Sequence, residues 1–183
     1  MIPIIPKREL MLLGAAYREI DEVLRWPEAE FYKVADTVSD WSPAQQVLHM
    51  GLVNAAIFQR IEVLYAGESH DILRTGGPTM PGWAVMTFGR IPRGKAKAPK
   101  EMVPPPDVDR IQARAAIMAS KKHIPWLADK APVLHTLRGK LPHFRLGNFT
   151  ALQWLKLARI HTQFHLGIAS EIRHAPASVR VDS

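Results

Sequence analysis

Apolar side chains recur at three- and four-residue steps in four stretches of the chain, and this spacing predicts four amphipathic α-helices. The first helix is expected to end near Trp26, just before Pro27. The second should begin at Ser42, which forms a Ser-x-x-Gln capping box with Gln45, and should continue to about Tyr65. Little of the chain alternates apolar and polar residues as a half-buried strand does, so the pattern favours an all-α fold.

Two further helices are expected in the second half of the chain. Asp107 is the predicted N-cap of the third helix, which should end before Pro125. The fourth should follow a capping box of Thr150 and Gln153 and extend to about His174. The predicted apolar stripe of the third helix consists of Ile111, Ala115 and Met118. That of the fourth consists of Trp154, Ala158, His161, His165, Ile168 and Ile172.

A long connection at residues 66–106 separates the second and third predicted helices. Seven of the 15 prolines and five of the 11 glycines lie between Gly76 and Pro106, a composition that predicts neither helix nor central strand. A shorter connection covers about residues 131–149. Four helices with one long connection predict a four-helix bundle with a crossover between helices 2 and 3. We expect one domain over residues 1–183, with its helical core at about 7–174.

The composition is typical of a globular protein, because 47% of the 183 residues are hydrophobic and 22% are charged. The chain has no cysteine, which excludes a disulfide scaffold, cysteine-ligated zinc and catalysis by a protein thiol. Its amino terminus has no basic region ahead of an apolar core, and no uninterrupted apolar run approaches the roughly 18 residues that span a bilayer. We therefore expect a cytoplasmic protein without a signal peptide or a membrane partner.

The net charge of +7 is unevenly distributed along the chain. Residues 1–75 carry a charge of −4 and residues 76–183 a charge of +11, with five basic side chains and no acidic one between Arg90 and Lys100. Arg90 and Arg93 are candidate donors to an anionic small-molecule substrate, and a solvated surface loop is the alternative interpretation. Nucleic-acid binding is less favoured, because the basic residues come without an aromatic platform or a recognition motif.

Two histidines occupy the inward face of the fourth predicted helix. His161 and His165 are four residues apart, so their side chains project from the same face. Burial of two neighbouring imidazoles costs free energy unless each finds a partner, and a divalent metal binds neutral imidazole nitrogen efficiently. His49, among apolar residues of the second helix, is the candidate third ligand. The alternative is a set of ordinary core histidines, hydrogen-bonded to carbonyl groups or to each other, and the spacing does not decide between the two.

Three histidine ligands would leave a coordination position open for water or substrate, as in catalytic zinc sites. A metal at such a site lowers the pKa of a bound water or thiol, and so generates a nucleophile in a protein without cysteine. The segment HTQFH lacks the glutamate of His-Glu-x-x-His, which argues against a zinc protease. No carboxylate stands near the three histidines on the predicted helices, so the sequence names neither a general base nor partners for the outer imidazole nitrogens.

Three segments carry a resemblance to a known family. They are WSPAQQVLHM at the start of the second helix, IPRGKAKAP in the crossover, and LPHFRLGNFTALQWLKLARIHTQFHLGI in and before the fourth helix. Together they resemble the DinB-like (DinB/YfiT-like) superfamily, and more narrowly a bacterial branch with a His-Pro-Phe-Phe-Gly-like stretch. The most specific feature is WSxxxxxxH paired with a final HTxxH, and the likeness extends to about His174. The segment LPHFRLG departs from the branch pattern, which leaves His143 without an assigned role.

The resemblance implies a four-helix bundle in up-down-down-up order, frequent homodimers, and one divalent ion (nickel, zinc, manganese or iron) held by three histidines. The matching residues here are His49, His161 and His165. Known members of the superfamily include transferases and isomerases that use low-molecular-weight thiols such as bacillithiol or mycothiol. We therefore expect a metal-binding protein that acts as a thiol-dependent S-transferase or a related metal-dependent enzyme. A non-catalytic metal-binding or structural protein of the same fold is the alternative.

Overall fold

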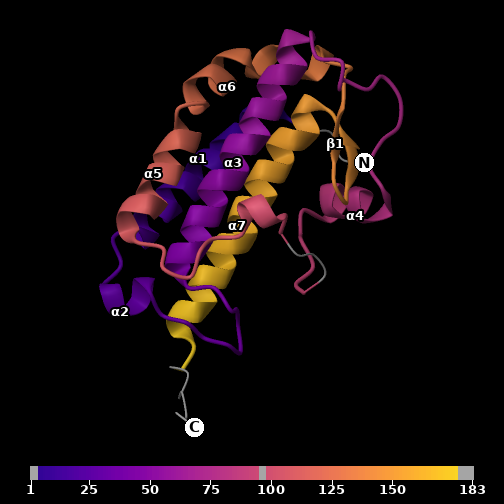
Figure 1. Cartoon of the computed structure of the whole chain (residues 1–183). Coiled ribbons are helices and arrows are strands. Elements are labelled where there is room, and N and C mark those ends of the chain that lie inside the picture. The colour runs from indigo at the N-terminus through magenta and orange to yellow at the C-terminus, as the bar shows by residue number, and fades with distance from the viewer. Residues whose placement is uncertain (1–3, 95–97, 177–183) are drawn as a thin grey trace.

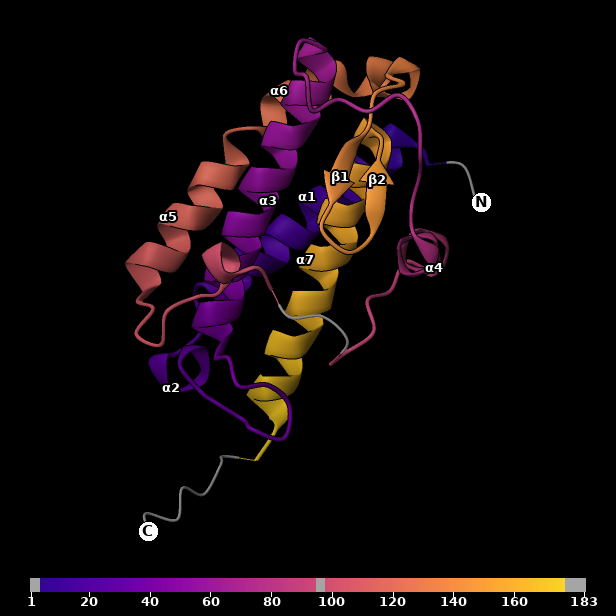
Figure 2. The ribbon, with the colours of Figure 1, turned by 45° about the vertical axis from the view of Figure 1, so that its right-hand side comes forward.

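The computed structural model describes residues 4–94 and 98–176. Nearly all regular structure in these residues is helical, and the one sheet is a two-stranded hairpin (Figures 1 and 2), so the prediction of an all-α fold is confirmed. The longer helices are α1 (Pro6–Val23), α3 (Pro43–Ala66), α5 (Arg110–Lys121) and α7 (Ala151–His174). The shorter elements are α2 (Glu28–Phe31), α4 (Met80–Phe88), α6 (Ile124–Lys130), the 3-10 helices η1 (Lys100–Met102) and η2 (Ala131–Thr136), and the strands β1 (Leu141–His143) and β2 (Gly147–Phe149).

Helices α3 and α7 begin where their capping boxes predict. The Ser42 hydroxyl accepts a hydrogen bond from the Gln45 backbone N–H, and the Gln45 side chain accepts one from the Ser42 N–H at 2.9 Å. Thr150 and Gln153 form the same pair at the start of α7. Each box satisfies two backbone N–H groups that would otherwise lack partners at a helix start, and so fixes which residues of the helix face inward.

Helix α3 lies between α5 and α7, and α1 packs against α7 (Figure 1). The approach of α5 to α3 is close at Gly51, where an added Cβ would lie 2.6 Å from the backbone carbon of Ala116. Small residues at this crossing let the two backbones come together. The largest side chains that are fully buried between the helices include Phe31, Phe58, Phe149, Met50, Met86 and Leu155.

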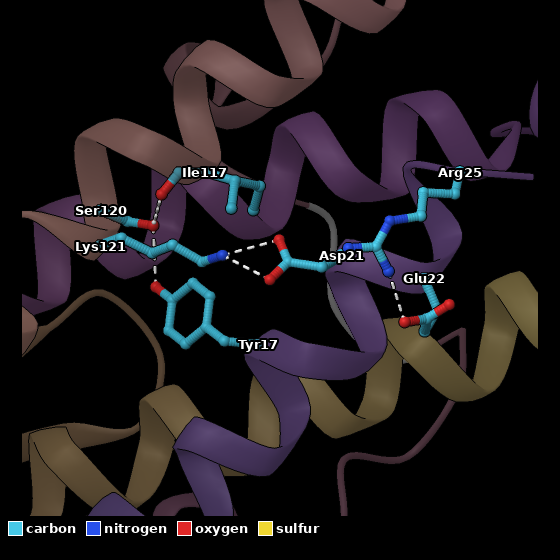
Figure 3. Close-up of polar contacts among 7 residues, drawn as sticks. All are labelled: Tyr17, Asp21, Glu22, Arg25, Ile117, Ser120 and Lys121. Atoms are coloured by element: carbon cyan, nitrogen blue, oxygen red, sulfur yellow. Dashed lines mark hydrogen bonds and ion pairs between the residues drawn. The ribbon is translucent and has the colours of Figure 1, made fainter.

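A buried polar network joins the four longer helices. The hydroxyl of Tyr17 on α1 donates to Oγ of Ser120 on α5 at 2.8 Å (Figure 3). The amide of Asn54 on α3 donates to the Tyr17 hydroxyl at 3.2 Å and to Oγ1 of Thr162 on α7 at 2.9 Å. Because paired buried polar groups are satisfied only in one packing arrangement, this network fixes how the helices fit together.

The prediction that residues 66–106 contain no helix is wrong for Met80–Phe88, which form α4. Thr79 caps this helix by accepting the Gly82 backbone N–H, and Pro81 lies in its first turn, where no backbone N–H is required. Gly89 ends it in the left-handed region, with φ of 65°. Proline and glycine therefore mark the two ends of this helix, whereas their density in the sequence suggested an irregular loop.

Two predictions about α5 are also wrong. Its N-cap is Asp109, not Asp107, and Asp109 forms a capping box with Gln112. The predicted apolar stripe is the outer face, since Ile111 is 79% and Met118 is 58% exposed. The face packed on α3 consists of Ala113, Ala116, Ile117 and Ser120. Helix α5 turns its small side chains toward α3 because the two backbones approach closely at Gly51. The prediction instead placed the large apolar side chains of α5 inward.

One helix, α3, is long and apolar enough by composition to cross a membrane. In the most apolar 18-residue stretch of α3, 50% is buried inside the fold. A core helix of a soluble protein has the same properties, so the structure is compatible with a soluble protein.

Candidate metal centre

The three histidines predicted as ligands come together in the fold. His49 is on α3, and His161 and His165 are on successive turns of α7, which packs against α3. The Nε2 atom of His161 lies 3.2 Å from Nε2 of His49 and 3.1 Å from Nε2 of His165. The three side chains thus offer ligand atoms that all lie within 4.8 Å of one another. Four-residue spacing on one helix and a facing residue on a neighbouring helix produce this convergence.

In two of these imidazoles the outer ring nitrogen, Nδ1, is held by an oxygen acceptor. His49 Nδ1 donates to the backbone carbonyl of Met102 at 2.6 Å, and His165 Nδ1 donates to Oε1 of Gln46 at 2.5 Å. A carbonyl oxygen has no hydrogen to give, so each Nδ1 carries the ring hydrogen. The Nε2 atoms of both rings therefore present lone pairs to the centre of the cluster. Metal-binding histidines are held in this way by acceptors at their outer nitrogens.

His161 cannot satisfy both neighbours by hydrogen bonding. Its Nε2 faces two lone pairs and, if it carries the ring hydrogen, donates to only one of them. Its Nδ1 is buried and has no hydrogen-bond partner in the described part of the chain. A cation at the centre would accept all three Nε2 lone pairs, and would leave Nδ1 of His161 as a donor. Tetrahedral ligands about 2.0–2.1 Å from zinc lie roughly 3.3–3.4 Å apart, close to the separations found here.

Burial keeps the three imidazoles in their neutral, metal-binding form. It lowers the pKa of His49, although the hydrogen bond to Met102 acts in the opposite direction. It lowers the pKa of His161 and His165 well below the ordinary range, and the neighbouring histidines of the cluster lower both further. No proton would therefore have to leave these residues for a metal to bind at neutral pH.

Aromatic rings pack against two of the three histidines. The ring of Trp41 lies 5.0 Å from that of His49 and stacks 6.4 Å from that of His165. Phe164 contacts the edge of His165, with the ring centroids 5.1 Å apart. Trp41 is half-buried, and it stands next to the N-cap of the helix that carries His49. These apolar rings reduce the access of water to the histidines, which strengthens any electrostatic interaction inside the cluster.

The crossover reaches the cluster through η1, whose Met102 carbonyl accepts from His49. Arg90 and Arg93, the predicted substrate donors, are exposed and form no hydrogen bond with the histidines. Arg93 makes a bidentate pair with Glu171 of α7, at 2.8 and 2.7 Å. Lys95 and Lys97 of the basic segment lie outside the described residues. The substrate role of the two arginines stays a prediction.

His143, which had no assigned role, has a structural one in the hairpin. Its Nδ1 accepts hydrogen bonds from the backbone N–H groups of Arg145 and Leu146, at 3.1 and 3.2 Å. Burial lowers its pKa to about 4, and the nearby charge of Arg60 acts in the same direction. The imidazole is therefore neutral at neutral pH and closes the turn between β1 and β2.

Gln46 and Met102, which hold the Nδ1 atoms of His165 and His49, were not among the predicted site residues. Gln46 could have been found, because it lies one turn before His49 in a predicted helix and so shares its face. Met102 acts through its backbone carbonyl, which no side-chain pattern can indicate. Comparisons with protein family models, with curated proteins and with solved structures give no match for this chain.

Proposed function

We propose that this protein binds one divalent transition metal through Nε2 of His49, His161 and His165. The observation that carries the proposal is the convergence of the three Nε2 atoms while Nδ1 of His49 and of His165 is engaged by an oxygen acceptor. An ordinary core histidine pairs its ring N–H with an acceptor and its other ring nitrogen with a donor, and gains nothing from facing another histidine lone pair to lone pair. We propose nickel, zinc or iron as candidate ions, since imidazole suits these metals and a three-histidine set does not select one. Manganese is a candidate from the family resemblance alone.

We further propose that the chain is a DinB-like protein in which α1, α3, α5 and α7 form a four-helix bundle. Support comes from the resemblance of the WSPAQQVLHM and HTQFH segments and from the packing of α3 against both α5 and α7. The same resemblance suggests a homodimer, which sedimentation of the purified protein would test.

The enzymatic role that fits best is a transferase that uses a low-molecular-weight thiol. A metal at the three histidines would supply a Lewis-acidic position at which a thiol loses its proton near neutral pH. The chain's own contribution is to keep three neutral imidazoles fixed by Met102 and Gln46, and to shield them with Trp41. The cluster includes no carboxylate among the described residues, so no general base is built into it. For this reason a non-catalytic metal-binding protein is the second candidate.

Elemental analysis of protein purified without an affinity tag tests the metal site. We expect about one equivalent of one transition metal, and loss of it in His161→Ala. His70→Ala is the matched control, because His70 is a surface histidine whose side chain is 95% exposed. Addition of nickel, zinc or manganese should raise the melting temperature of the metal-free wild type but not that of His161→Ala, since a ligand of the native state stabilises it. Less than about a tenth of an equivalent, together with no thermal stabilisation, would contradict the proposal.

The two candidate functions are separated by activity. Wild type and His161→Ala are compared in the conjugation of electrophiles with several low-molecular-weight thiols. A rate that is lost in His161→Ala and kept in His70→Ala supports the transferase. Full metal occupancy in wild type, with equal rates in wild type and His161→Ala, supports the non-catalytic candidate.

A further inference from the structure

Helix α7 also borders a cavity on the side away from its histidines. The cavity has a volume of about 260 Å³, and residues of α1, α4 and α7 line it. Its polar walls consist of Arg8, Glu9, Thr87, Lys156 and Arg159. Lys156 precedes His161 by five residues, which is about 140° around an α-helix. The cavity is therefore separate from the histidine cluster.

Lys156 buries most of its side chain, while its ammonium group reaches the cavity without a hydrogen bond or ion pair among the described residues. Its side chain lines the cavity and the residue is only 8% exposed, although the helical pattern places it away from the inward stripe of α7. Within the described residues it forms neither a hydrogen bond nor an ion pair. Burial lowers its pKa, with Glu9 acting in the opposite direction and Arg159 and Arg8 adding to the shift. The Lys156 Nζ atom is not among the buried atoms that lack a partner, so solvent reaches the ammonium group and an anion that enters the cavity can pair with it.

Thr87, near the end of α4, contributes a second unpartnered group. Its hydroxyl oxygen is buried and has no hydrogen-bond partner in the described part of the chain. A helical threonine commonly donates to the carbonyl four residues earlier, as Thr162 does to Ala158 at 2.8 Å. The Thr87 hydroxyl makes no such bond, and it lines the same cavity as Lys156. Both groups are hydrogen-bond donors that an anion would satisfy.

The charge around the cavity is positive. Glu9 is buried at 5% exposure and is already paired, since Nε of Arg159 donates to its Oε2 at 2.5 Å. Arg159 also donates through Nη1 to Gln163 at 2.7 Å. Arg8 is exposed and adds a third cation to Lys156 and Arg159, against the single carboxylate of Glu9. A concave, partly enclosed surface with excess positive charge concentrates anions.

We propose that this cavity binds a small oxyanion, either inorganic phosphate or the phosphate or carboxylate group of a small molecule. The Lys156 ammonium and the Thr87 hydroxyl are its main donors, and Arg8 assists from the surface. The volume lies slightly below the roughly 300–1,000 Å³ of pockets that enclose whole drug-sized ligands, so the cavity suits one anionic group or a very small anion. The site is independent of the metal centre.

Titration calorimetry at constant ionic strength tests the proposal with inorganic phosphate, sulfate and succinate as probes. Wild type should bind at least one of them at a single site. Lys156→Met should weaken that binding roughly tenfold or more, and Thr87→Val several-fold, because charge-assisted hydrogen bonds are the stronger ones. Lys122→Met is the matched control, because Lys122 is an exposed lysine that follows α5 and is not part of the cavity wall. Preference for phosphate or for succinate assigns the anion class.

Three results would overturn the proposal. They are no binding of any probe to wild type at 10 mM, equal affinities of wild type and Lys156→Met, and loss of binding in His161→Ala, which would place the anion at the histidine cluster. Melting curves without probe show whether each variant is folded. If Lys156→Met does not fold, the anion affinities of Thr87→Val and Lys156→Gln are compared with that of wild type under the same criteria. Retained binding in His161→Ala keeps this test separate from that of the metal site.

Discussion

His165 and Gln46 form a hydrogen bond of 2.5 Å between Nδ1 and Oε1, across the contact of α7 with α3. The amide nitrogen of Gln46 in turn donates to Oγ of Ser39 at 3.1 Å, which fixes the orientation of the amide. Gln46 is 1% exposed, so its polar atoms have no access to bulk water. The two hydrogen bonds that link Ser39, Gln46 and His165 set the tautomer of His165 and direct its Nε2 toward the other two histidines.

Replacement of Gln46 by leucine should therefore weaken metal binding by about 10–100-fold without removing a ligand, the range typical for the loss of such an outer partner. Competition with a chromophoric chelator measures the affinity. Gln59→Leu is the matched control, because Gln59 is an exposed glutamine on the same helix. Unchanged affinity in Gln46→Leu, with a folded protein, would show that the orientation of His165 does not depend on this bond.

The lowered pKa of His143 predicts that acid destabilises the fold. Its pKa in the folded state is about 4, against an ordinary value of 6.5, so the unfolded chain takes up a proton that the folded chain does not. The free energy of unfolding should fall as the pH drops from about 6.5 towards 4, by an amount on the order of 2 kcal/mol from this residue. Urea denaturation at several pH values measures it.

His143→Asn should reduce this pH dependence, because asparagine does not titrate and its side-chain oxygen accepts backbone N–H groups as Nδ1 does. The variant keeps the hairpin turn while removing the titration. His70→Ala is the control and should retain the full pH slope. The same slope in His143→Asn would assign the acid sensitivity to other groups, such as the three clustered histidines, whose pKa values burial also lowers.

The candidate site was more predictable than the arrangement of the helices around it. His49, His161 and His165 could be placed because the capping boxes fix where α3 and α7 start, and the four-residue spacing fixes their face. The orientation of α5 could not be predicted, because its buried face is chosen by the space left beside Gly51 and not by the size of its apolar residues. The role of Met102 depends on a contact 53 residues away in the chain, which local patterns do not contain.

The buried Tyr17 hydroxyl should contribute to stability. It donates to Ser120 and accepts from Asn54, and burial raises its pKa to about 12. Tyr17→Phe leaves Asn54 without that acceptor in the core, so we expect a loss of about 1–2 kcal/mol in the free energy of unfolding. Tyr65→Phe is the control, because Tyr65 is 38% exposed, and it should change stability by less than about 0.5 kcal/mol. A neutral Tyr17→Phe would mean that the network does not stabilise the helix packing.

Gly51 and Gly167 provide a matched pair for the crossing of α3 and α5. In an exposed helix interior, glycine to alanine stabilises by up to about 1 kcal/mol, and Gly167→Ala on α7 should do so because its new methyl group meets no atom within 4 Å. Gly51→Ala has the same gain in helix propensity. However, its methyl group would lie 2.6 Å from the Ala116 backbone and would force α3 and α5 apart. Overpacking of this kind costs about 1–3 kcal/mol, so the net effect should be destabilising. Urea denaturation of both variants measures the difference, and a stabilised Gly51→Ala would show that α5 does not approach α3 so closely.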